Sequence, residues 1–189
     1  GLNIDLTGLP GVRLGTDQGT LTYSGVLTPD GTVYRTGGGR VAYASGNLGL
    51  VITNLTNDGA TPRTLVIDSV GLVCPSNATH TGGTIVTNAG AIHVRGDHAL
   101  GAVPATYAPA NLYVDGGVLR PGNLSFTLNA NRGITVGPNG MILHQYGSQT
   151  MTVNGGLHGS GAITNTDSGA VTLAGPGNPY DGAATPTHG

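Results

Sequence analysis

Apolar residues recur along the chain in short runs, and each run ends at a Gly, Asn, Asp or Ser. The segments Thr64-Leu-Val-Ile-Asp and Asn111-Leu-Tyr-Val-Asp are typical, because β-branched and aromatic residues alternate with polar ones and turn formers follow. No segment keeps a helical period long enough for a stable helix. The pattern predicts an all-β chain of many strands, most of about five residues, with no substantial helix.

A second regularity overlies the strands, since several of them pair as strand, short glycine corner, strand. One valine anchors each such unit, and the anchors recur along the sequence at uneven but similar intervals. A loose period of about 20 residues is typical of a solenoid whose rungs carry loops of different length. We therefore expect one β-solenoid domain over 1–189 of about nine rungs, or roughly 45 Å, with less regular rungs in 1–70 and clearer ones in 71–189. The anchors are Val86, Val114, Val136, Val153 and Val171.

Composition strengthens the all-β prediction and narrows the function. Gly accounts for 35 of 189 residues and Pro for 11, and the chain contains neither Lys nor Glu. These two missing residues favour helices, so a helical bundle or βαβ domain is excluded. With 38% hydrophobic and 8% charged residues the chain is not of disordered type. The net charge of −2 predicts no nucleic-acid partner. The lack of any long, continuous apolar run predicts no membrane insertion.

The stretch Thr79-His-Thr-Gly-Gly-Thr-Ile-Val-Thr-Asn-Ala-Gly-Ala-Ile-His-Val, followed by Asp97-His-Ala-Leu-Gly, resembles the autotransporter-associated β-strand repeat. His80 stands where that family usually has an aromatic residue. The run from Val171 to Asp181 looks like the start of another copy, with Asp181 in place of the usual Thr. The resemblance implies a right-handed parallel β-helix, secreted by a bacterium and located at the cell surface or outside the cell. It also implies a passenger-type stalk, adhesin or scaffold.

Catalysis or cofactor binding needs clustered functional groups, and the sequence shows few. Asp and Arg occur singly and mostly at corners, although Asp115 and Arg120 share one strand–corner–strand unit. Cys74 has apolar neighbours, which predicts a buried residue, and Arg95-Gly96-Asp97 is interpreted as a turn rather than a receptor ligand. We expect no catalytic residues, no cofactor and no metal site, hence no enzyme. The histidines, which lack zinc-site spacing, are His80, His93, His98, His144, His158 and His188.

The remaining candidates are the two chain ends and the tyrosines. Solenoid ends expose unpaired strand edges unless they are capped, and no helical or charged cap is evident. We therefore expect a rigid extracellular rod that stacks head-to-tail with itself into a filament, surface layer or stalk. The alternatives are an adhesin passenger fragment that binds glycan or a host surface through loops on one face, where the tyrosines could form an aromatic face for sugars, and a polysaccharide-active β-helix enzyme. The predicted self-assembly edge residues are Leu2, Ile4, Leu6, Val171, Leu173 and Tyr180. The tyrosines are Tyr23, Tyr34, Tyr43, Tyr107, Tyr113, Tyr146 and Tyr180.

Overall fold

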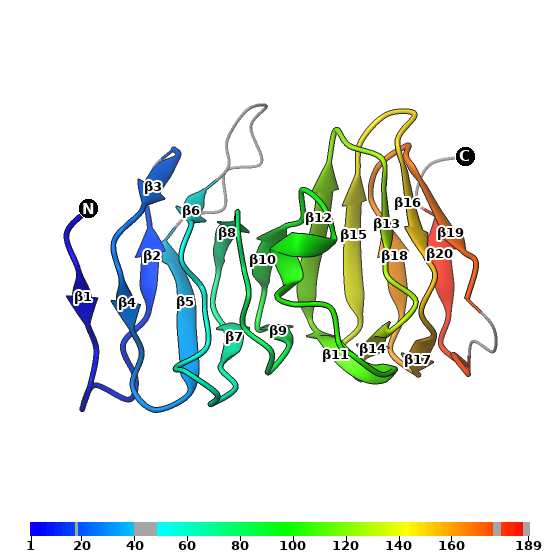
Figure 1. Ribbon diagram of the computed structural model, residues 1–189. Coiled ribbons are helices and arrows are strands. Elements are labelled where there is room, and N and C mark those ends of the chain that lie inside the picture. Colours follow the sequence, from blue (N-terminus) through cyan, green and yellow to red (C-terminus); the bar gives the residue numbers. More distant parts are fainter. Residues whose placement is uncertain (18, 40–48, 176–178, 187–189) are drawn as a thin grey trace.

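The computed structural model describes residues 1–17, 19–39, 49–175 and 179–186. Its strands stack side by side along one axis, from β1 at the N-terminal end to β20 at the C-terminal end (Figure 1). Every pairing between named strands is parallel, and the inner strands of each long sheet pair with strands from the turns before and after them. The all-β parallel solenoid is therefore confirmed, whereas its right hand remains a prediction.

Two long sheets form two sides of the solenoid. The seven-stranded sheet consists of β2 (Leu14–Thr16), β5 (Val33–Gly39), β7 (Thr64–Ile67), β9 (Thr84–Thr87), β11 (Ala108–Asp115), β14 (Arg132–Val136) and β17 (Leu157–Gly159). The eight-stranded sheet consists of β3 (Leu21–Tyr23), β6 (Leu50–Ile52), β8 (Gly71–Pro75), β10 (Gly90–His93), β12 (Gly117–Gly122), β15 (Met141–Gln145), β18 (Ile163–Asn165) and β20 (Ala184–Pro186).

Shorter pairings form a third side, which the chain visits after the eight-stranded sheet and before the next strand of the seven-stranded sheet. At the N-terminal end β1 pairs with β4, and in the middle Leu55 pairs with Ala78. At the C-terminal end three strands form a sheet. The strands of this side are β1 (Ile4–Asp5), β4 (Leu27–Thr28), β13 (Phe126–Leu128), β16 (Thr150–Val153) and β19 (Ala170–Leu173). A short 3-10 helix, η1 (Asp97–Leu100), lies between β10 and β11.

Inward side chains form registered ladders that make up the core. In the seven-stranded sheet Ile67, Val86, Val114 and Val136 stand in register on four successive strands. Each of these side chains is at most 1% exposed. One turn cannot bury such residues alone, so the stability of each turn depends on its neighbours.

Two details of the predicted repeat were wrong. Val153 and Val171 do not continue the ladder of Val86, because they lie in β16 and β19 on the third side. They do not even pair with each other, since Val171 is in register with Met151. The solenoid has about seven turns rather than nine, as the seven-stranded sheet shows. The true ladder runs from Val86 through Val114 and Val136 to Gly159, which is a longer advance per turn than the expected period.

Candidate functional site

In the described part of the chain, most strands at the two ends of the solenoid have no further strand beside them, but the outer edge of β17 is bridged at Gly159 by Tyr180. Among the described residues, β1, β2 and β3 are the outermost strands at the N-terminal end, and β19, β17 and β20 are the outermost at the other. All four sheets, the two long ones and the two short ones of the third side, are parallel, so the strands at both ends run in the same direction. Unpaired strand edges carry N–H and C=O groups that can pair with another chain.

The N-terminal end also exposes apolar side chains. Leu2 is 84% exposed, and Leu21 is 50% exposed although it stands in register with fully buried Leu50. The other two predicted edge residues at this end are less accessible than Leu2, because Leu6 is buried and Ile4 packs against the core. Ile4 is also tied to the next turn, since its N–H donates to the carbonyl oxygen of Val26 at 3.0 Å. The inner edge of β1 is thus hydrogen-bonded to the next turn, and its outer edge pairs with no other described strand.

The C-terminal end opens into the core through an apolar cavity of about 250 Å³. Both methionines of the chain, Met141 and Met151, line it together with Leu157 and Ile163. Its lining comes from the last described turns of all three sides, β14 to β20. A solenoid interior is normally filled by side chains of the next turn.

Three predicted edge residues border this cavity. Val171 and Leu173 lie in β19, where Val171 packs against the core and Leu173 is 45% exposed. Tyr180 is half-buried, and its hydroxyl donates to the carbonyl oxygen of Gly161 at 2.6 Å. The structure therefore brings these three residues together at one mouth, while the role of the mouth stays a prediction.

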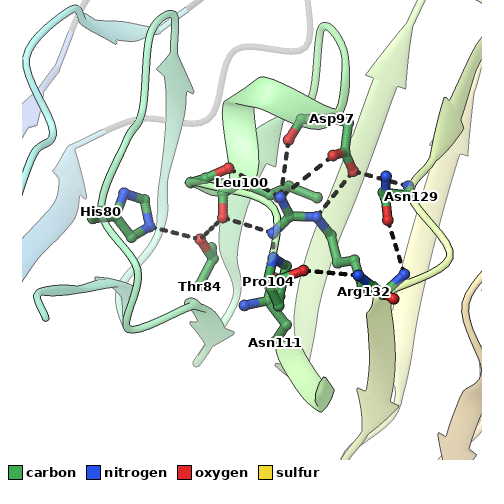
Figure 2. A network of polar contacts seen from close by, with 10 residues as sticks. His80, Thr84, Asp97, Leu100, Pro104, Asn111, Asn129 and Arg132 are labelled. Carbon is green, nitrogen blue, oxygen red and sulfur yellow. Dashed lines mark hydrogen bonds and ion pairs between the residues drawn. The ribbon is translucent and has the colours of Figure 1, made fainter. Parts of the chain in front are cut away.

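A buried polar network that the sequence did not reveal lies in the middle of the solenoid (Figure 2). Arg132 in β14 is 0% exposed, and its Nε lies 2.9 Å from Oδ1 of Asp97. Its Nη1 donates to the Leu100 carbonyl oxygen at 3.0 Å and to Oδ1 of Asn111. Its Nη2 donates to the Gly101 carbonyl oxygen at 2.9 Å. These contacts satisfy a buried charge and fix η1 against β11 and β14.

The same network explains the tripeptide Arg95-Gly96-Asp97. Gly96 precedes η1 with a φ of 150°, and the Asp97 carboxylate is held by Arg132 and by the Asn129 N–H. The carboxylate that a receptor would have to contact is thus engaged within the chain. Arg95 and Gly96 form a bend that leads into η1, whose first residue is Asp97.

Buried histidines border the network and the neighbouring sheet. The His80 ring is fully buried, with its Nε2 3.2 Å from the Thr84 hydroxyl, and the pKa of His80 falls to about 4 because burial and then the Arg132 charge disfavour protonation. In β10, burial and then the charges of Arg120 and Arg95 lower the pKa of His93 to about 4. Both rings are therefore neutral at pH 7.

Within the described ranges, the catalytic and metal candidates are not gathered into a site. Asp115 ends β11 and its carboxylate accepts hydrogen bonds from Asn139, at 2.7 Å from the backbone N–H and 3.1 Å from the side-chain amide. Arg120 lies in β12 of the other sheet, with its guanidinium over the Tyr146 ring. Among the described residues, no three His, Cys, Asp or Glu side chains are placed to hold a metal ion. Cys74 is buried, as expected, and burial raises the pKa of its thiol.

The tyrosines are distributed over several sides of the solenoid. Tyr34 is a core residue whose hydroxyl donates to the Thr56 carbonyl oxygen at 2.9 Å. Tyr107 is 45% exposed, and Tyr113 in β11 is half-buried. Tyr146 packs edge-on against His144 next to the eight-stranded sheet. Tyr43 and His188 lie outside the described residues. No single aromatic face contains all the described tyrosines.

Comparison with known proteins gives one informative similarity. Over 114 residues, 60% of this chain, the sequence is 33% identical to the adhesin BmaC autotransporter of Brucella suis biovar 1 (strain 1330). The matched segment spans about 3% of that protein's length. No family model and no solved structure matches the chain. The similarity and the parallel solenoid support an autotransporter-like passenger architecture, while the specific repeat family stays a prediction.

The structure adds one finding that bears on location. None of the helices in the described part of the chain is long and apolar enough to cross a membrane.

Proposed function

We propose that this chain is a non-enzymatic β-solenoid rod of an extracellular or surface-located bacterial protein, and that its ends join copies head-to-tail. The observation that carries the proposal is the pair of open ends. One end exposes Leu2 and Leu21, and the other exposes Leu173 beside an apolar cavity. The likeness to a segment of an autotransporter adhesin supports the surface location.

Stacking would repeat the contact that already joins the turns. The outermost strands β1 and β3 of one copy would face β19 and β20 of the next, which belong to corresponding sides of the solenoid, and β2 would face the Tyr180 segment that pairs with β17. Fully burying one leucine stabilises a contact by about 1.5–3 kcal/mol, so the exposed leucines and the cavity together give a substantial driving force. Because the contact joins two different surfaces and does not close, it produces a filament.

Sedimentation velocity and negative-stain electron microscopy of the purified chain, over a wide range of concentrations, test the stacking. We expect the sedimentation coefficient to rise with concentration and thin unbranched filaments to form. Monodisperse monomers at every concentration would refute head-to-tail stacking. A rod-shaped monomer in small-angle scattering would still support the mechanical role.

Adhesion is the second candidate function, and the named relative favours it, because that protein is described as an adhesin. In this case the sides of the rod, rather than its ends, contact the target. Polysaccharide cleavage receives no comparable support, since Asp115 binds Asn139 and Arg120 lies on the other sheet. Loss of activity in Asp115→Ala on an acidic-polysaccharide panel would revive that alternative.

A further inference from the structure

The outer face of the seven-stranded sheet carries a registered row of side chains. Ile85, Tyr113, Thr135 and His158 stand in register on β9, β11, β14 and β17. All four are partly exposed, and none carries a permanent charge. Successive members lie one strand spacing apart, about 4.8 Å, so the row runs parallel to the axis of the rod.

Two tyrosine rings on this face lie beside bare glycines. A Cβ atom at Gly137 would sit 2.5 Å from the Tyr113 hydroxyl oxygen and 2.6 Å from Cγ of Asp115, so the Tyr113 side chain reaches across the next turn. The Tyr107 hydroxyl would be in contact with a Cβ atom at Gly156 and hydrogen-bonds with Nε2 of His158. Glycine at these positions leaves room for both tyrosine hydroxyls against the sheet.

The rings are held in place by contacts with the sheet. The Thr135 hydroxyl donates to the Pro109 carbonyl oxygen at 2.9 Å, which fixes the segment that follows Tyr107 onto β14. The Tyr107 and His158 ring centroids are 5.9 Å apart. Beside Tyr113, the Asp115 carboxylate is oriented by Asn139. The face therefore combines two positioned aromatic rings with a carboxylate, an amide and an imidazole.

We propose that this face, defined by Tyr107, Tyr113, Asp115, Asn139 and His158, binds a neutral glycan laid along the rod. A pyranose ring has an apolar C–H face that packs on an aromatic ring, and an edge of hydroxyls that bonds to carboxylate, amide and imidazole groups. The row from Ile85 to His158 is uncharged and bordered by one carboxylate, which suits a neutral sugar better than a polyanion, because Asp115 would repel a polyanion. The next charge in the same register is Arg35 on β5, two strands beyond Ile85, and it is paired with Asp68. The proposal rests on the adhesive role above and names its ligand class.

The test uses isothermal titration of the full chain with cellohexaose, and with an oligogalacturonate as the anionic comparison. We expect cellohexaose to bind, Tyr113→Ala to weaken the binding by about tenfold or more, and Tyr113→Phe to retain most of it. Tyr146→Ala, which removes a tyrosine near the other sheet, is the matched control and should bind as the wild type does. No binding of cellohexaose, preference for the oligogalacturonate, or an unchanged affinity in Tyr113→Ala would overturn the proposal. Circular dichroism of each variant shows whether the fold is kept.

A second assay separates failure of this site from failure of the adhesive role. Fluorescently labelled chain is applied to epithelial cells before and after glycosidase treatment. Binding that both the enzyme and Tyr113→Ala abolish supports the glycan face. Binding that survives both indicates a protein receptor, which overturns the glycan face and keeps adhesion. An absence of any cell binding refutes the adhesive role itself.

Discussion

Arg132 and Asp97 are separated by 35 positions in the sequence, yet they form an ion pair of 2.9 Å with the guanidinium completely buried. The pair joins η1 to β14 across an intervening turn of the solenoid. The Asp97 side chain remains 19% exposed, whereas the Arg132 side chain has no contact with water. The Arg132 charge therefore depends more on the ion pair than the Asp97 charge does.

Asp97→Ala should therefore lower the free energy of unfolding by about 3 kcal/mol, because removing one partner leaves a buried charge uncompensated. Urea denaturation measures the loss. Asp58→Ala is the matched control, since that carboxylate is 76% exposed and 3.4 Å from Arg63, and such a pair contributes about 0–1 kcal/mol. Equal losses in the two variants would contradict the importance given to burial.

Acid should destabilise the fold between about pH 6.5 and about pH 4. His80 and His93 have pKa values of about 4 when folded, below the ordinary value of 6.5. Between these values the unfolded chain binds more protons, so the free energy of unfolding falls as the pH decreases, by at most about 3 kcal/mol per histidine. Urea midpoints from about pH 7 to about pH 4 report the slope.

The variant His93→Gln separates this effect from general acid denaturation. It should remove a large part of the slope but not all of it, because His80 still contributes, and so does His144, whose pKa is also lowered by burial. His98→Gln, in which an exposed histidine is replaced, should keep the wild-type slope. A slope that is identical in all three proteins would show that other groups govern the acid response.

Gly161→Ala should destabilise the solenoid by about 2 kcal/mol. A Cβ atom at position 161 would overlap the carbonyl oxygen of Gly137 on the preceding turn, so the two turns would have to separate. Thermal unfolding followed by circular dichroism gives the change. Gly11→Ala is the control, because nothing lies within 4 Å of a Cβ there. Similar melting temperatures for the two variants would mean that the turns are less closely packed than the structure indicates.

Assembly should respond to charge at the ends and not on the sides. Leu173→Asp places a carboxylate beside the apolar C-terminal mouth, so we expect it to abolish the concentration-dependent rise in sedimentation coefficient. Ile142→Asp changes a side chain of similar exposure, 42% against 45%, in β15, away from both ends. It should assemble like the wild type. Filaments formed by Leu173→Asp would place the contact elsewhere.

The fold class followed from the sequence because its strongest signals are local. Short apolar runs with glycine corners define rungs wherever they occur, and Val86, Val114 and Val136 do form one ladder. The assignment failed at Val153 and Val171 because all sides of a solenoid use the same β-forming residues. The spacing between two valines does not show which side of the solenoid a strand occupies. The expected length of a turn was therefore too short and the expected number of turns too large.

The functional candidates were predictable to a smaller extent. The self-assembly edge residues were predicted from a strand-like pattern without a cap at both chain ends, and their role stays a prediction. Arg132 could not be identified, since its partners come from η1 and from β11, and only the folded turns bring them together. A single Arg without Glu or Lys nearby carried no local signal of burial. The row formed by Tyr113, Thr135 and His158 likewise depends on register, which variable loops conceal.

The Arg132 network has a consequence for the behaviour of the rod under load. In a solenoid each turn contacts its neighbours, so we expect a chain pulled from its C-terminal end to lose β20, β19, β18 and β17 in sequence, each with a small resistance. The Arg132 guanidinium of β14 is bonded to Asp97 in η1, to Gly101 and to Asn111 in β11. Unfolding of β14 therefore requires these contacts with the preceding turns to break together. We therefore expect the Arg132 network to raise the force needed to unfold the middle of the molecule, so that the N-terminal half stays folded when the C-terminal end is stretched.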